Sequence, residues 1–225
     1  MNIQILYEDN HLIVVEKPVN MPVQEDQSRD MDLQSLVKKD IKERYQKPGN
    51  VYLALIHRLD RPVGGAIIFA KTSKAASRMA NLLRKREIKR SYLAVVRGQM
   101  TQKAGRLTDY LWKDRQKNEV YVVHKDKNGA KRAILDYSLL DTGDNLSFIK
   151  VELQTGRSHQ IRVQMKQLGY PLYGDQKYGE HVNKHGQQIA LWSNTLSFVH
   201  PVKNEEIHVT SAPPNRYPWN IWQEK

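Results

Sequence analysis

The sequence predicts an α+β fold with a central, mostly antiparallel mixed β-sheet and helices packed on its faces. Short apolar runs of strand length recur along the chain and are separated by turn residues. Other segments repeat their apolar residues at helical spacing. No Pro-rich or Gly/Ser-rich linker interrupts the 225 residues. We therefore expect one compact domain over residues 1–225.

The first third of the chain alternates strands with one helix. Residues 3–6 and 12–15 are predicted as two strands joined by a turn. Apolar positions at helical spacing predict a helix from Asp32 to about Arg44. Residues 51–56 and 66–70 are apolar runs with the length of buried strands, and a polar loop lies between them.

The remaining elements follow the same alternation. Thr72 or Ser73 is expected to cap a helix, and a strand follows over residues 92–96. Residues 106–136 are predicted as antiparallel hairpins, with a further strand over residues 148–153. Ser158 is expected to open a short helix that ends at Gly169. Strands are predicted around residues 189–198 and 207–210, and the aromatic residues near the end are expected to pack as a hydrophobic latch.

Composition narrows the class of protein. Lysine and arginine number 36 against 24 acidic residues, a formal charge of +12. Such a surplus attracts polyanions, because phosphate contacts supply most non-specific affinity for nucleic acid. The chain has no cysteine, which excludes disulfides and fits a reducing cytoplasm. No apolar run reaches the length of a membrane span, and the first residues do not resemble a secretory signal.

The loop between the two apolar runs carries the strongest chemical signal. Its sequence is His57-Arg58-Leu59-Asp60-Arg61-Pro62-Val63-Gly64-Gly65. A carboxylate at the end of a core strand lies between two arginines, which favour its ionised form, the form that a nucleophile requires. The paired glycines allow another backbone or a ligand to come close. The residues alone favour a plain surface ion pair of Asp60 with Arg58 or Arg61. We also expect this loop to cross a cleft.

Two further segments are candidates for binding phosphate. The first contains Arg84, Arg86, Lys89 and Arg90 at the end of a predicted helix, where positive charge also complements the helix dipole. The second contains Arg157, His159, Gln160 and Arg162 around the start of the short helix. Free N–H groups and partial positive charge at a helix N-terminus favour an anion there.

Four stretches in the same order resemble the RluA-type pseudouridine synthases. They are Leu6-Tyr7-Glu8-Asp9 with Val14-Val15-Glu16-Lys17-Pro18, the His57–Gly65 loop, Arg90-Ser91-Tyr92-Leu93-Ala94-Val95-Val96-Arg97-Gly98, and Thr155-Gly156-Arg157-Ser158-His159-Gln160-Ile161-Arg162-Val163. The segments Gly169–Asp175 and Tyr178-Gly179 continue the resemblance. It covers nearly the whole chain. It implies a pseudouridine synthase-like catalytic domain with an RNA-binding cleft and without a separate N-terminal RNA-binding domain.

The resemblance also implies roles for individual residues. Asp60 takes the place of the catalytic aspartate, Tyr92 that of a tyrosine packed against the target base, and Arg162 that of an arginine paired with the aspartate. Arg58 and Arg61 join the basic residues named above as expected RNA contacts. The implied reaction converts a specific uridine in ribosomal or transfer RNA to pseudouridine without a cofactor or metal. We expect a cytoplasmic, monomeric enzyme that does not bind membranes.

Two other functions fit parts of the sequence. A non-catalytic RNA-binding protein or RNA chaperone would explain the charge and the aromatic residues, and it would not need Asp60. A metal-dependent nuclease would need clustered carboxylates, and the sequence shows no such cluster.

Overall fold

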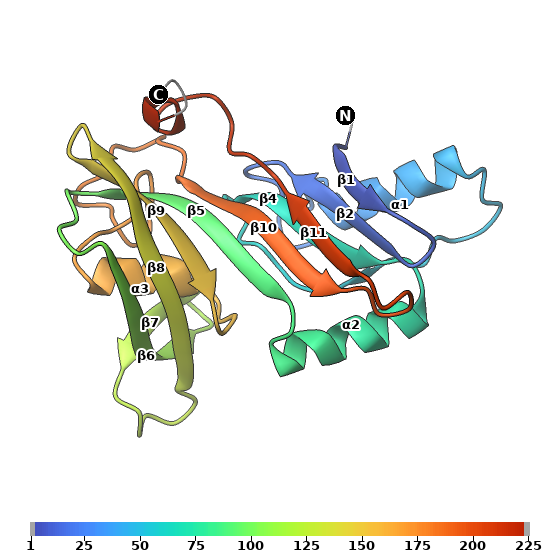
Figure 1. Ribbon diagram of the computed structural model, residues 1–225, viewed down its shortest axis with the longest axis horizontal. Helices are drawn as coiled ribbons and strands as arrows, with labels where there is room; N and C mark the ends of the chain where they lie inside the picture. The colour runs from blue at the N-terminus through green and yellow to red at the C-terminus, as the bar shows by residue number, and fades with distance from the viewer. Residues whose placement is uncertain (1–2, 223–225) are drawn as a thin grey trace. The chain divides into compact units, whose positions relative to one another are not determined.

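The computed structural model of the chain describes residues 3–222 (Figure 1). These residues form two compact units. The described residues up to Arg90, together with Ser193–Ala212, make the first unit, and Ser91–Trp192 with the described residues from Pro213 onward make the second. The boundaries fall inside two strands, β5 (Lys89–Arg97) and β10 (Leu191–Val199).

The first unit is built on strands in the order β1-β2-β4-β10, with β3 paired to β4 and β11 paired to β10. The bounds are β1 Ile5–Glu8, β2 Leu12–Lys17, β3 Ala54–Leu55, β4 Gly64–Ala70 and β11 Glu206–Thr210. β2 and β4 pair antiparallel from Leu12↔Ala70 to Lys17↔Gly65. Every residue of β4 is buried, which indicates that both faces of the sheet are covered here.

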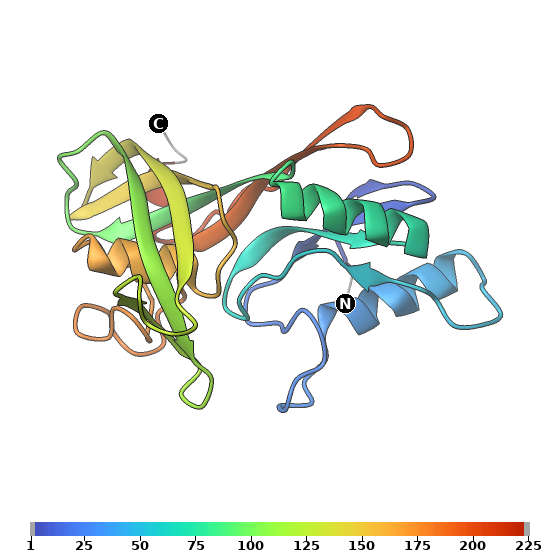
Figure 2. The ribbon, with the colours of Figure 1, turned by 90° about the horizontal axis from the view of Figure 1, so that it is seen from below.

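Two capped helices cover these strands. α1 (Leu33–Arg44) begins after Asp32, whose side chain accepts the Ser35 N–H at 2.9 Å. α2 (Ser73–Lys85) begins after Thr72, whose hydroxyl accepts the Ala75 N–H at 3.2 Å. Each cap satisfies an N–H that has no partner within its helix. In Figure 2 the two helices lie on opposite sides of the β4 ribbon.

The second unit contains an antiparallel sheet in the order β5-β9-β8-β6-β7. The bounds of the strands are β6 Ala104–Asp114, β7 Glu119–Val123, β8 Lys131–Gly143 and β9 Leu146–Leu153. The same unit contains α3 (Gln160–Gln167) and a 3-10 turn over Trp219–Trp222. Val163 of α3 packs with Leu111 and Val120 on one face of this sheet. The ring of Phe148 stacks on Trp222 at 5.1 Å, so the aromatic end of the chain packs as a latch, as expected.

The α+β fold and the antiparallel hairpins are confirmed, and two elements differ from expectation. The strand expected over residues 51–56 is only Ala54–Leu55. β3 and β10 both pair with β4, so β3 has only the end of β4 at Phe69 and Ala70 to pair with. The last helix begins at Gln160 instead of Ser158, because His159 adopts a left-handed backbone with φ 51°. None of the helices in the described part of the chain is long and apolar enough to cross a membrane.

Gly65 generates a prediction about the stability of the first unit. Its φ is +110°, and a Cβ there would clash with the backbone of Ser193 in β10, lying 2.7 Å from its nitrogen. A Gly65→Ala change should lower the free energy of unfolding by about 3 kcal/mol or more, because a backbone clash adds to the strain of a left-handed residue. Gly49→Ala is the matched control, since a Cβ there meets nothing within 4 Å. Urea unfolding of both variants would measure this, and equal stabilities would contradict the prediction.

Candidate active site

Asp60 lies half-buried on the loop between β3 and β4. The Val63 N–H donates to the Asp60 carbonyl at 2.9 Å, which closes a tight turn over Arg61 and Pro62. Leu59 and Val63, on either side of this turn, are 8% and 2% exposed. Buried anchors on both sides hold the carboxylate on a turn of fixed shape.

The buried ammonium of Lys17 fixes this turn by a hydrogen bond from the interior of the first unit. Lys17 is the last residue of β2 and is 0% exposed. Its Nζ donates to the carbonyls of Pro18 at 2.9 Å, Met21 at 2.7 Å and Arg61 at 2.9 Å. These three acceptors match the three N–H groups of an ammonium. Burial lowers the pKa of Lys17 to about 7, although the nearby Asp60 carboxylate acts in the opposite direction.

The side chain of Arg61 holds the same turn from the outside. Its guanidinium forms ion pairs with Asp26, at 3.8 Å, and with Asp30. It also donates to the Ser28 hydroxyl at 3.1 Å and to the Asn20 carbonyl at 3.2 Å. Arg58 and Arg61 are both exposed, but Arg61 is bound to an acidic loop of its own unit.

His57 opens the loop as a buried neutral ring. It is 6% exposed, and its Nε2 accepts the Ile68 N–H at 3.3 Å. The proton of the neutral ring is then on Nδ1, which has no hydrogen-bond partner among the described residues. Burial, together with the charge of Arg90, lowers the pKa of His57 to about 3.

Arg162 is the buried charge of the second unit. It lies on α3, is 6% exposed, and forms a bidentate ion pair with Asp175 through two bonds of 2.8 Å. Burial alone would raise the pKa of the Asp175 carboxyl, but the guanidinium and the N–H groups of Lys177 and Tyr178 outweigh it and hold that pKa below its usual value. A guanidinium with a fixed, planar partner has one orientation.

Tyr178 contacts Arg162 from another side. The guanidinium carbon lies 5.1 Å from the centroid of the Tyr178 ring, within the range of a cation–π contact. The Tyr178 hydroxyl accepts the Val120 N–H of β7 at 2.8 Å and hydrogen-bonds Nδ1 of His159 at 2.6 Å. The second unit thus brings together His159, Arg162, Asp175 and Tyr178.

The other expected site residues have varied surroundings. Tyr92 lies in β5 and is 4% exposed. Gln160 is 3% exposed and donates to the Ile134 carbonyl at 3.0 Å, while its oxygen accepts from Thr155 at 2.8 Å. Arg157 is exposed and donates to the Arg132 carbonyl at 3.0 Å. In the first unit, Arg84, Arg86 and Lys89 are exposed and Arg90 is half-buried.

Sequence reasoning gave no role to three residues that the structure places at these sites. Lys17 precedes a proline at the end of a strand, and its complete burial, which the sequence does not show, is the feature that indicates its role. Asp175 follows Gly174, and Tyr178 comes three residues later. A short acidic turn after a helix with a buried arginine is a weak signal, because most aspartates in turns are solvated. Within the described residues, no group of three or more His, Asp or Glu side chains could hold a metal ion.

Comparison with known proteins identifies the family. Residues 11–167 match the model of the RNA pseudouridylate synthase family. The chain is 33% identical over 214 residues to the uncharacterized RNA pseudouridine synthase YhcT of Bacillus subtilis, covering 94% of this chain and 68% of YhcT. It is 30% identical to the tRNA pseudouridine synthase C of Haemophilus influenzae, covering 93% of this chain and 92% of that protein.

The chain spans about two thirds of the length of most of the curated relatives it matches. A solved structure, human RNA pseudouridylate synthase domain containing 4, has the same fold, with a TM-score of 0.78 and 21% identity over 94% of this chain and 88% of that one. This chain belongs to the RNA pseudouridylate synthase family. The resemblance to the RluA type and the enzyme class, an isomerase of the pseudouridine synthase type, are both confirmed.

The buried pair of Arg162 and Asp175 generates a second prediction. An Asp175→Asn change removes the bidentate carboxylate from the buried guanidinium, and removing one member of a buried pair costs about 3–5 kcal/mol. Asp136→Asn is the matched control, because the Arg106–Asp136 pair is exposed, with side-chain exposures of 65% and 28%, and such pairs contribute about 0–1 kcal/mol. Urea unfolding would compare them, and equal losses of stability would contradict a special role for the buried pair.

His57 generates a prediction about pH. Its pKa is about 3 in the folded protein against 6.5 in an unfolded chain, so between these values the unfolded chain binds a proton that the folded protein does not. The free energy of unfolding should therefore fall as the pH drops from 6.5 toward 3, by up to about 1.4 kcal/mol per pH unit. His57→Gln should remove this part of the slope, because glutamine does not titrate.

Urea unfolding at several pH values would test the His57 prediction. The difference between wild type and variant isolates His57 from the carboxylates that titrate in the same range. Parallel curves for wild type and His57→Gln would show that the prediction is wrong.

Proposed function

We propose that this chain isomerises a specific uridine of structured RNA, ribosomal or transfer, to pseudouridine, with Asp60 as the catalytic carboxylate. The observation that carries the proposal is the family match over residues 11–167, a range that includes the fixed Asp60 turn. A relative of nearly the same length is named as a tRNA pseudouridine synthase, which supports an RNA substrate for this chain.

The reaction rearranges one nucleotide without redox change. The bond between the ribose carbon C1′ and N1 of uracil breaks, the base turns, and C1′ joins C5; the proton on C5 leaves and N1 gains one. Asp60 can contribute by attacking the base, by attacking C1′, or by removing a sugar proton so that a glycal forms. Each route needs an ionised, positioned carboxylate, and the turn held by Lys17 and Arg61 supplies a fixed position.

Tyr92 and Arg162 complete the proposed machinery. Tyr92 is assigned the contact with the target base, since an aromatic ring can stack on a uracil that has left its helix. Arg162 is assigned the charge that orients the carboxylate, and its bidentate bond to Asp175 fixes the guanidinium. Asp175 and Tyr178 act through Arg162 as positioning residues.

The basic surface is assigned the binding of the RNA backbone. Moving a uridine out of its stack costs a few kcal/mol, and cationic contacts with neighbouring phosphates offset this cost. Arg58, Arg84, Arg86 and Lys89 are exposed and suited to such contacts. Arg61 can join them when an RNA phosphate takes the place of Asp26 and Asp30. A cytoplasmic location and a monomeric state stay predictions.

Asp60→Asn tests the proposal directly. The amide has the shape of the carboxylate, and the backbone carbonyls of Asp60 and Arg61 accept the hydrogen bonds that hold the turn, so the fold should persist. Turnover should fall by about 1,000-fold or more, as for other essential catalytic residues, while RNA binding stays within about tenfold. Asp40→Asn, at a partly exposed ion pair on α1, is the matched control and should retain full activity.

The measurement is pseudouridine mapping of total RNA from cells with and without this gene, complemented by wild type, Asp60→Asn or Asp40→Asn. Positions that vanish without the gene should return with wild type and Asp40→Asn only. Full turnover by purified Asp60→Asn protein would refute the assignment of Asp60. If purified wild type binds transcripts that lack modifications but forms no pseudouridine in them, the non-catalytic RNA-binding function replaces the proposed one.

A further inference from the structure

The outward face of the β6–β7–β8 hairpins carries an aromatic pair that the proposed machinery does not use. Leu111 and Val120 point inward and pack against α3. Side chains alternate along a strand, so Trp112 and Tyr121, which pair across β6 and β7, point outward. Their ring centroids are 6.3 Å apart with 31° between the planes, and Tyr121 is 39% exposed.

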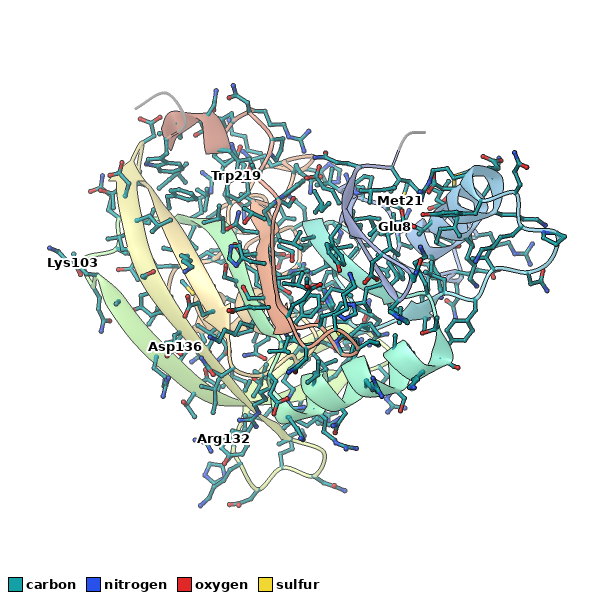
Figure 3. All side chains as sticks on the ribbon, turned by 45° about the vertical axis from the view of Figure 1, so that its right-hand side comes forward. Glu8, Met21, Lys103, Arg132, Asp136 and Trp219 are labelled. Atoms are coloured by element: carbon teal, nitrogen blue, oxygen red, sulfur yellow. The ribbon has the colours of Figure 1, made fainter. Side chains whose placement is uncertain are left out.

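Cationic side chains border this pair. Lys127, on the loop between β7 and β8, places its Nζ 4.5 Å from the centroid of the Trp112 ring. Arg132 of β8 pairs in register with Tyr110 of β6, which shares its strand face with Trp112. Figure 3 shows Arg132 beside this loop. We call Trp112, Tyr121, Lys127 and Arg132 the hairpin platform.

The segment around the platform is strongly basic. It carries seven basic residues, Lys113, Arg115, Lys117, Lys125, Lys127, Lys131 and Arg132, against three acidic ones, Asp114, Glu119 and Asp126. The net charge of residues 112–132 is +4, 7 minus 3. Strand alternation places Lys113 and Lys131 on the α3 face and Asp114 and Glu119 on the platform face, where Glu119 accepts a hydrogen bond from the Tyr121 hydroxyl. The positive charge beside the rings therefore comes from Arg132 and from the loop residues Arg115, Lys117, Lys125 and Lys127, and it complements a polyanion.

Hairpin stability explains only part of this arrangement. A cross-strand aromatic pair stabilises a sheet, and it does so without surrounding lysines and arginines. An exposed Tyr121 ring and a half-buried Trp112 ring bordered by cations match the chemistry of an unpaired nucleotide, since the base stacks on a ring and the phosphate meets a positive charge. A duplex offers the phosphates but keeps the faces of its bases covered.

We propose that the hairpin platform is a second RNA-contact surface, which stacks unpaired nucleotides of the substrate RNA on Trp112 and Tyr121. This inference rests on the proposed function, because it assumes an RNA substrate. Within the second unit the platform lies on the opposite face of the sheet from α3, which carries Arg162. It therefore holds RNA away from Arg162, and its loss weakens binding without slowing the reaction of bound RNA.

The stacking part is tested with Trp112→Ala and Tyr121→Ala, and with Trp112→Phe and Tyr121→Phe as controls that keep a ring. The probes are a fluorescein-labelled 12-nucleotide single-stranded RNA of mixed sequence and the same strand in a blunt duplex, measured by fluorescence anisotropy. Each alanine variant should bind the single strand about tenfold more weakly and the duplex within about twofold. Each phenylalanine variant should stay within about threefold on both probes. Thermal unfolding by circular dichroism would confirm that every variant is folded at the assay temperature.

The charge part is tested with Lys127→Gln and Arg132→Gln. Each should reduce the salt dependence of single-strand binding by about 0.7 in the slope of log affinity against log salt, the value for one phosphate contact. Lys103→Gln is the matched control. Lys103 is exposed and precedes the far end of β6, about 30 Å along the strand from Trp112, so its slope should stay that of wild type.

Activity on total RNA separates this inference from the proposed function. At saturating RNA the alanine variants should form pseudouridine at the wild-type rate, and half-saturation should need about tenfold more RNA. If wild type forms pseudouridine and the alanine variants bind the single strand as well as the phenylalanine variants do, the inference about the hairpin platform is wrong and the proposed function is retained. Equal weakening on single strand and duplex would overturn base stacking. If the platform binds as expected but wild type forms no pseudouridine, the proposed function fails and the platform stands.

Discussion

The hydrogen bonds of the buried Lys17 ammonium are the constraint on which the candidate site depends. One charged nitrogen bonds the carbonyls of Pro18, Met21 and Arg61, so the end of β2, the segment after it and the Asp60 turn share a single anchor. A buried ammonium is costly unless all its protons have acceptors. That cost makes the arrangement specific, because any shift of the turn would leave a charge or a carbonyl without a partner. The position of Asp60 is thus fixed by its neighbours' backbone.

In the second unit, the buried Arg162 guanidinium fixes the segment from Asp175 to Tyr178. Arg162 and Asp175 form a bidentate pair, and the N–H groups of Lys177 and Tyr178 also donate to the Asp175 carboxylate. Buried ion pairs often add little to stability compared with apolar packing, yet losing one partner is expensive. Both units therefore use desolvated charge for orientation more than for net stability. The exposed ion pairs of Arg61 differ, because solvent weakens them and an RNA phosphate can replace their carboxylates.

The sequence indicated most of the fold because local signals agreed with the packing. Thr72 caps α2 as expected, α1 lies in the segment predicted to be helical from Asp32, and the hairpins of the second unit follow the alternation of Glu119–Val123. The site was predicted as far as the resemblance reached, since it named Asp60, Tyr92 and Arg162. It did not reveal Lys17 or Asp175 as partners, because hydrogen bonds to carbonyls leave no pattern in sequence. The start of α3 was misplaced because the left-handed conformation of His159 depends on its contacts, including the bond to Tyr178.

The hydroxyl of Tyr178 has a consequence for solubility. β7 is the last strand in its sheet order, and the free edge of such a strand is a template on which another chain can add and start aggregation. Tyr178 takes the N–H of Val120 on this strand, and Lys117 and Lys125 flank it with charge. The Tyr178 side chain thus contacts the Arg162 guanidinium with its ring and occupies a hydrogen-bond donor of the β7 edge with its hydroxyl. Loss of this hydroxyl would then loosen the contact with Arg162 and also leave a strand-edge N–H open to pairing with another chain.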